Sequence, residues 1–263
     1  MICKVLLINN FTFASNYKII LKLVIYKMKK LLIASTSTLH SGAYLDYLLP
    51  QIEHLFSKCD TLLFIPYAQP SGITCDEYTE IVSAAFSKIN KKIIGLHTFE
   101  NPSEAVNNAQ GIFTGGGNTF LLVKQLYDNN IMHVLKSVIE KGTPYLGTSA
   151  GSNITGVSMQ TTNDMPIVYP PSFITIGAIS FNINPHYLDP DPNSKHMGET
   201  RETRIKEFHS FNDLPVLGLR EGSWLEVNGE QILLKGNLSA RLFEKNKLPI
   251  EIISGSELSN LGK

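Results

Sequence analysis

From residue 30 onward, short apolar runs alternate with segments whose apolar residues recur at helical spacing. The short runs predict strands, and they cover residues 31–34, 61–66, 93–96, 111–114 and 144–147. Residues 44–57, 119–127 and 131–139 predict helices instead. Strands that alternate with helices are typical of a parallel sheet covered on both faces. We therefore predict an α/β fold of three layers, a mostly parallel sheet flanked by helices.

The second part of the chain has a different pattern. Six prolines occur between residues 166 and 192, followed by a predicted helix near 199–209 and predicted short strands at 216–219, 224–227 and 231–234. We expect the loops of this part to form the rim of a pocket, because binding residues concentrate in loops. Ligands of parallel sheets bind beyond the carboxyl ends of the strands, so functional residues should gather at that edge.

Residues 1–27 are apolar and basic, contain no acid, and precede the sequence Met28-Lys29-Lys30, which is typical of a chain start. Polar residues interrupt the segment too often for a signal peptide or a membrane span. We interpret it as a misassigned upstream start or an appendage, with a targeting segment as the alternative. No repeat or linker divides the remainder, so residues 28–263 predict one domain.

Charge and cysteine content limit the kinds of molecule that the chain is expected to bind and the compartment in which it is expected to work. The 23 basic and 23 acidic residues of the 263-residue chain balance, so no net field attracts nucleic acid or an anionic membrane. The three cysteines suit a reducing, cytoplasmic compartment, and the seven histidines lack the spacing of zinc ligands. We expect a small-molecule substrate, no metal and no cofactor; monomer and homodimer both stay open.

Ser149 lies in a GxSxG pattern, Gly147-Thr148-Ser149-Ala150-Gly151, between a predicted strand and a segment able to enter a helix. This is the context of a nucleophile elbow, a sharp turn that exposes a serine hydroxyl above a sheet. A structural serine in a turn of small residues is the alternative, because short motifs give false positives. Ser149 is thus a candidate nucleophile.

A serine nucleophile needs a base to take its proton and an acid to orient that base. His186 is the first candidate base, because residues 181–185 deliver it from a short strand into a loop stiffened by proline. His196 is its competitor. Glu221 is the candidate acid, since it follows the predicted strand at 216–219.

An α/β-hydrolase would have a different order of triad residues along the chain, serine then acid then histidine. Here that order would use Ser149, then Asp189 or Asp191, then His196 or His209. The residues alone leave both orders open.

A glycine-rich turn, Gly115-Gly116-Gly117, follows one predicted strand and opens the helix at 119–127. Backbone N–H groups at such a place bind anions. One of them, with the N–H of Ala150, could form an oxyanion hole. A phosphate cradle is the rival interpretation, although the run lacks the lysine and the spacing of known phosphate-binding loops; a plain turn is the third.

Five motifs occur in one order along residues 29–243: FTGGGN at 113–118, GTSAGSN at 147–153, TTNDMP at 161–166, NPH at 184–186 and GETR at 198–201. In this combination the chain resembles the peptidase E family of α-aspartyl dipeptidases. The resemblance implies a class I glutamine-amidotransferase-like, flavodoxin-like fold for the catalytic domain. It also implies a cytoplasmic serine exopeptidase that hydrolyses dipeptides with an N-terminal aspartate and needs no metal.

The same resemblance assigns roles to residues of this chain. It implies that Ser149 is the nucleophile that forms the acyl-enzyme, His186 the general base and acid, and Glu221 the orienting acid. The oxyanion hole would come from the amides of Gly116, Gly117 and Ala150.

Arg201 matches an arginine suited to hold the aspartyl side chain, because a guanidinium can grip a carboxylate through paired hydrogen bonds. A surface ion pair with Glu202, Glu207 or another nearby acid is the alternative. The further candidate substrate-binding residues are Asn118, Asn163 and Asp164.

Two features depart from the family: Ser152, where alanine is frequent, and the extension at 1–27. A cyanophycinase-like or other hydrolase on the same scaffold, and a non-enzymatic small-molecule binding protein, are the alternative functions.

Overall fold

The computed structural model describes residues 29–263 except 192, 194, 196 and 197. The predicted extension at 1–27 and the candidate base His196 therefore lie outside the described residues. Within the described part of the chain, no helix is long and apolar enough to cross a membrane.

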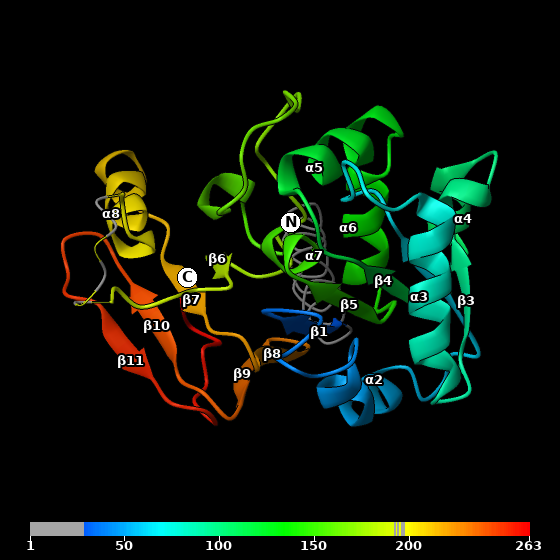
Figure 1. The fold of residues 1–263 in the computed structure, drawn as a ribbon, viewed down its shortest axis with the longest axis horizontal. Coiled ribbons are helices and arrows are strands. Elements are labelled where there is room, and N and C mark those ends of the chain that lie inside the picture. The colour runs from blue at the N-terminus through cyan, green and yellow to red at the C-terminus, as the bar shows by residue number, and fades with distance from the viewer. Residues whose placement is uncertain (1–28, 192, 194, 196–197) are drawn as a thin grey trace, which may run out of the picture.

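A seven-stranded sheet forms the centre of the molecule, in the order β3-β2-β4-β5-β1-β8-β9 (Figure 1). Neighbouring strands from β3 to β1 are parallel, and β8 and β9 add an antiparallel edge. The strands are β1 (Lys30–Ala34), β2 (Thr61–Ile65), β3 (Lys92–Gly95), β4 (Ile112–Thr114), β5 (Tyr145–Thr148), β8 (Ser223–Asn228) and β9 (Gln231–Gly236). The prediction of a mostly parallel sheet flanked by helices is confirmed.

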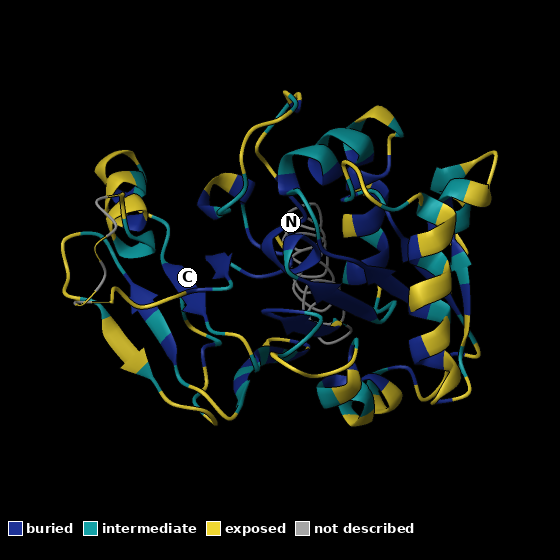
Figure 2. Ribbon diagram, in the orientation of Figure 1, coloured by how far each residue is buried: buried dark blue, intermediate teal, exposed yellow. Residues whose placement is uncertain are grey.

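Alternation along the strands explains how both faces are covered. Leu31 and Ile33 of β1 pack on the side of α4, α5 and α6, whereas Leu32 and Ala34 pack on the side of α2 and α3. Successive side chains of a strand point to opposite faces, so an uninterrupted apolar strand requires helices on both. The strand interiors are accordingly buried (Figure 2). The helices are α2 (Leu49–Leu55), α3 (Cys75–Ser87), α4 (Pro102–Asn107), α5 (Thr119–Asp128) and α6 (Met132–Glu140).

A second sheet of four strands lies beside the first, in the order β11-β10-β7-β6, with α8 (Arg201–Phe211) next to it (Figure 1). Its own small core consists of Tyr187, Ile205, Val216 and Phe243. The predicted helix near 199–209 and the predicted strands at 181–185 and 216–219 correspond to α8, β6 and β7, whereas β10 and β11 were not predicted. The strands are β6 (Asn182–Pro185), β7 (Val216–Leu219), β10 (Ala240–Phe243) and β11 (Ile250–Ile252).

The predicted helix at 44–57 is broken into two pieces. A 3₁₀ turn, η1 (Asp46–Leu48), precedes α2, and Leu45 before it has a positive φ of 61°. Pro50 lies in the first turn of α2, the one part of a helix where a missing N–H costs nothing. The remaining short elements are η2 (Leu96–Thr98), α7 (Ala150–Asn153) and η3 (Met159–Thr161).

Candidate active site

Ser149 occupies a strained turn between β5 and α7. Its φ of 53° is positive, a conformation that a residue other than glycine adopts only when its surroundings enforce it. The Ser149 N–H donates to the carbonyl of Ala34 at 3.2 Å. A side chain at Gly151 would lie 2.1 Å from the Thr114 carbonyl oxygen, and one at Gly147 would lie 2.4 Å from that of Gly151. Both glycines of the GxSxG pattern are thus required by close backbone packing.

His186 and Glu221 come from neighbouring strands of the other sheet. β6 and β7 are parallel, with Pro185 opposite Leu219, so the residues just beyond them emerge on the same edge. His186 Nε2 lies 2.8 Å from Ser149 Oγ, and His186 Nδ1 lies 2.7 Å from Glu221 Oε1. The structure therefore joins the three predicted residues in one chain of hydrogen bonds.

The described candidate residues of the alternative, α/β-hydrolase-like triad do not lie together in the structure. The Asp189 carboxylate pairs with Arg220, and His209 Nε2 contacts the carbonyl of Leu214. Asp191 accepts a hydrogen bond from the N–H of Asn193. None of these described groups contacts Ser149.

The glycine turn lies directly against the serine. A side chain at Gly116 would come within 2.9 Å of Ser149 Cβ. The Gly116 N–H donates to Tyr78 Oη at 3.1 Å, so this predicted oxyanion-hole donor already has a partner. The N–H groups of Gly117 and Ala150 have no hydrogen-bond partner among the described residues. Two of the three predicted donors are therefore free to bind a ligand.

A family model for peptidase family S51 matches residues 31–235. The chain belongs to peptidase family S51. The family resemblance seen in the sequence motifs is thereby confirmed.

Relatives in family S51 cover most of this chain. Peptidase E of Streptomyces coelicolor is 46% identical over 231 residues, which are 88% of this chain and 94% of the relative. A Drosophila melanogaster protein named "Probable alpha-aspartyl dipeptidase" is 45% identical over 82% of this chain and 90% of its own length.

Solved structures share the fold at lower identity. A peptidase from an acI-B1 Actinobacterium superposes with a TM-score of 0.64 at 15% identity, covering 88% of this chain and 96% of that one. A protein from Listeria monocytogenes EGD-e gives a TM-score of 0.61 at 21% identity, covering 80% and 99%. Both likenesses support the α/β fold.

Three of the predicted substrate-binding residues of this S51 member hold the loop next to the site. Asn118 caps the start of α5 and donates to the carbonyl of Met165. Asp164 accepts hydrogen bonds from the N–H and hydroxyl of Thr119, 2.7 and 2.6 Å away. Asn163 donates to the carbonyl of Pro185 at 2.7 Å. Their polar groups thus already have protein partners.

Arg201 lies at the start of α8, against the backbone of the candidate base. Its Nη1 donates to the carbonyls of Pro185 and His186, whereas its Nε and Nη2 make no hydrogen bond within the described structure. Burial lowers the pKa of Arg201 below its ordinary value, which the charge of Glu221 partly offsets. The alternative surface pair with Glu202 is not formed, since Glu202 pairs with Lys206 and Arg241.

Sequence reasoning missed three residues that hold the site together. Ser35 contacts the backbone of His186, Tyr78 contacts Gly116, and Arg220 precedes the candidate acid and binds two carboxylates. A capping box at Thr74 and Glu77 marks the start of α3, which carries Tyr78, so the helix had a sequence signal. The contacts themselves had none.

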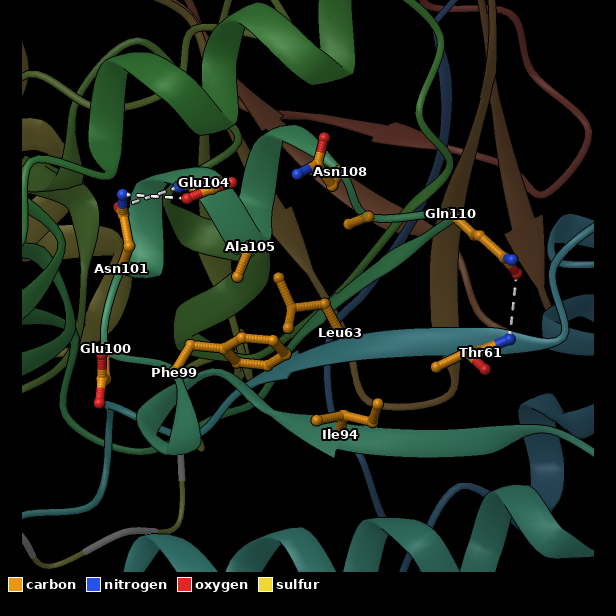
Figure 3. Close-up of a pocket in the computed structure, with 11 residues that line it drawn as sticks. Thr61, Leu63, Ile94, Phe99, Glu100, Asn101, Glu104, Ala105, Asn108 and Gln110 are labelled. Atoms are coloured by element: carbon orange, nitrogen blue, oxygen red, sulfur yellow. Dashed lines mark hydrogen bonds between the residues drawn. The ribbon is translucent and has the colours of Figure 1, made fainter.

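Pockets also open elsewhere on the described part of the molecule, and two of them are large. One, of about 560 Å³, is lined by an apolar floor that includes Leu63, Ile94 and Phe99, and by polar side chains in and beside α4 such as Glu104 and Asn108 (Figure 3). The other, of about 780 Å³, opens between α2 and the starts of β1 and β5. Neither contains a residue of the Ser149, His186 and Glu221 chain. Among the described residues, no cluster of potential ligands could hold a metal ion.

Proposed function

We propose that this chain is a serine exopeptidase that hydrolyses dipeptides with an N-terminal aspartate, with residues 28–263 as its catalytic domain. The observation that carries the proposal is the hydrogen-bonded chain from Ser149 through His186 to Glu221. The two 40–50% identical relatives are named peptidase E and α-aspartyl dipeptidase, which supports the same activity and substrate class.

The geometry is suited to acyl transfer. His186 Nε2 takes the hydroxyl proton as Ser149 Oγ attacks the carbonyl carbon of the Asp-Xaa bond. Glu221 accepts the Nδ1–H of His186, which fixes the tautomer and stabilises the imidazolium. The developing oxyanion receives the N–H groups of Gly117 and Ala150. His186 then protonates the leaving amine, and a water molecule hydrolyses the acyl-enzyme by the same steps in reverse.

Arg201 is the proposed partner of the substrate's aspartyl carboxylate. The Nε and Nη2 edge of its guanidinium is available, and such an edge binds a carboxylate through two parallel hydrogen bonds. Its Nη1 is already held by the backbone carbonyls of residues 185 and 186. Substrate binding would therefore use an arginine whose orientation is fixed in advance, which lowers the entropic cost of binding.

The first test measures hydrolysis of Asp-Leu, Ala-Leu and a β-aspartyl dipeptide by the wild type and by Ser149→Ala. The wild type should prefer Asp-Leu, and Ser149→Ala should lower kcat by about 10⁴-fold or more. Full activity of Ser149→Ala would refute the acyl-enzyme scheme. Equal rates on all three substrates would refute the aspartate preference, and rapid cleavage of only the β-aspartyl substrate would favour a cyanophycinase-like enzyme.

The second test compares Arg201→Ala with Arg204→Ala on the same panel. Arg204 is three residues further along α8, is exposed, and faces Glu199 at 3.7 Å, so it is a matched control. Loss of a charged hydrogen-bonding group costs about 1.5–3 kcal/mol, which is about 10- to 100-fold in kcat/KM for Asp-Leu. Because Arg201 also contacts the His186 carbonyl, the rate on Ala-Leu should fall as well, but by less than the rate on Asp-Leu. A selectivity unchanged in Arg201→Ala would leave this arginine with a purely structural role.

A further inference from the structure

Ser35 is a buried hydroxyl residue where the two sheets meet. It directly follows β1 and is 0% exposed. Its Oγ accepts a hydrogen bond from the backbone N–H of His186 at 2.9 Å and donates one to the carbonyl of Leu219 at 2.6 Å. Leu219 ends β7, two residues before Glu221. One hydroxyl therefore links the seven-stranded sheet to both strands that carry the base and the acid.

The residue before Ser35 holds the nucleophile in a similar way. The carbonyl of Ala34 accepts the N–H of Ser149 at 3.2 Å and the hydroxyl of Ser152 at 2.6 Å. Two adjacent residues at the end of β1 thus contact the backbone of the nucleophile and the backbone of the base. The separation of Ser149 from His186 depends on this dipeptide.

The backbone of His186 needs such support. Its φ of 53° is positive, and residues other than glycine keep that conformation only where surrounding contacts impose it. The Ser35 hydroxyl fixes the His186 N–H, and Arg201 contacts the His186 carbonyl. The ring is thereby held on the line between Ser149 and Glu221.

A serine can make both bonds at once, because its hydroxyl donates one hydrogen bond and accepts others. If Ser35 became alanine, the Leu219 carbonyl would keep the N–H of Tyr187, 3.1 Å away. The His186 N–H would lose the one hydrogen-bond acceptor it has among the described residues. The substitution should therefore disturb the backbone of His186 more than that of Leu219.

We infer that Ser35 is a positioning residue for His186, which sets the place of the imidazole relative to Ser149. The inference rests on the proposed serine-peptidase function. A displacement of about 1 Å in a catalytic group can cost about 100-fold in rate. The His186 N–H is occupied by the Ser35 hydroxyl, so we expect substrate binding itself to be little affected.

The experiment has two measurements. The first is kcat and KM for Asp-Leu, and the second is the rate at which a phosphonate labels Ser149 covalently, as detected by mass spectrometry. Ser35→Ala should lower kcat and the labelling rate by about 10- to 100-fold, with KM within about twofold. Thr175→Val is the matched control, because it also removes a buried hydroxyl bonded to a backbone carbonyl, that of Gly156 at 2.8 Å. It should label at the wild-type rate.

Labelling of Ser35→Ala at the wild-type rate would overturn the role of Ser35 while leaving the proposed function intact. A wild-type chain that the phosphonate does not label would overturn the proposed function and this inference with it. If Ser35→Ala does not fold, Ser35→Cys takes its place, since a thiol makes the same bonds more weakly. Its labelling should be slowed several-fold, and a wild-type rate in Ser35→Cys would equally overturn the inference.

Discussion

The two sheets that share the candidate active site are built in different ways. The seven-stranded sheet, which carries Ser149, is covered by helices on both faces and has an extensive apolar core. The four-stranded sheet, which carries His186 and Glu221, shares that large core on one face, through residues such as Ile183 and Leu217. Its other face has a core of only four buried residues. The strand before the nucleophile is therefore packed by apolar side chains on both faces, whereas the strands before the base and the acid have a large apolar core on one face only and are reinforced by polar contacts on the other side.

Charged side chains supply much of that additional support. Arg220, directly before Glu221, pairs with Asp189 from the loop after His186 and with Glu251 of β11. Its guanidinium carbon also lies 5.6 Å from the centre of the Tyr187 ring. Arg241 contacts Glu251 as well, at 3.0 Å. A cluster of charges thus joins the loops that hold the base and the acid.

The largest expected effect comes from breaking the hydrogen-bond chain on the side of the four-stranded sheet. Glu221→Gln keeps the shape of the side chain but removes the charge that stabilises the imidazolium, so kcat should fall by about 10²- to 10⁴-fold. Its melting temperature should change little, because the Glu221 side chain is 46% exposed. Steady-state kinetics on Asp-Leu with thermal denaturation checks both.

The matched control for Glu221→Gln is Glu226→Gln, a half-buried glutamate in β8 of the seven-stranded sheet. It should keep kcat within about twofold of the wild type. Equal losses in the two variants would indicate that neither glutamate orients His186.

A smaller effect is expected from the charge cluster. Arg220→Met removes both ion pairs of a side chain that is 15% exposed, and should lower the free energy of unfolding by about 1–2 kcal/mol. That is less than the 3–5 kcal/mol of a fully buried pair, because the two carboxylates are about half exposed. Urea denaturation measures it.

Lys124→Met is the comparison for Arg220→Met on the side of the seven-stranded sheet. Lys124 pairs with Asp128 one turn along α5, and such surface pairs contribute about 0.3–0.5 kcal/mol. If Arg220→Met and Lys124→Met lowered the free energy of unfolding by the same amount, charged contacts would contribute no more to the four-stranded sheet than to the seven-stranded sheet.

The smallest effect is a difference in acid sensitivity. Hydrogen bonds from Arg220, opposed by partial burial, hold the pKa of Glu251 at about 2, below the usual 4.5. A lowered pKa means that this stabilisation is complete above about pH 4.5 and is lost as the pH falls toward 2. Amide hydrogen exchange should therefore lose protection in β10 and β11 before β4 and β5 on acidification. In Glu251→Gln the difference in acid sensitivity between β10–β11 and β4–β5 should become smaller. If exchange in this variant were the same as in the wild type, Glu251 would not be the cause of the difference.

Much of the seven-stranded sheet could be predicted because its strands are short apolar runs that need no other context. The sequence also predicted Ser149, since the glycines of its turn leave a local signature. α3 was missed although its buried residues, Tyr78, Val82, Ala85 and Phe86, recur at helical spacing. β10 and β11 are only four and three residues long, and β11 is largely exposed, so neither has a clear period.

The supporting contacts of the site could not be predicted, for a physical reason. Ser35 and His186 are 151 positions apart, and Tyr78 and Gly116 are 38 positions apart. Such pairs form only when the sheets are assembled. A single serine after a strand, or a single tyrosine in a helix, is part of no sequence pattern that would predict its distant partner. The same applies to Gly116, whose N–H is withdrawn from the predicted oxyanion hole by a residue on a distant helix.

The positive φ angles of Ser149 and His186 have a consequence for protein engineering. Each residue costs about 1–3 kcal/mol in this conformation, and glycine would adopt it with less strain. Substitution by glycine should therefore raise the melting temperature at these two positions, but it would also remove the reacting groups. A search for thermostable variants that ignores activity should therefore favour glycine at both positions and lose the nucleophile and the base.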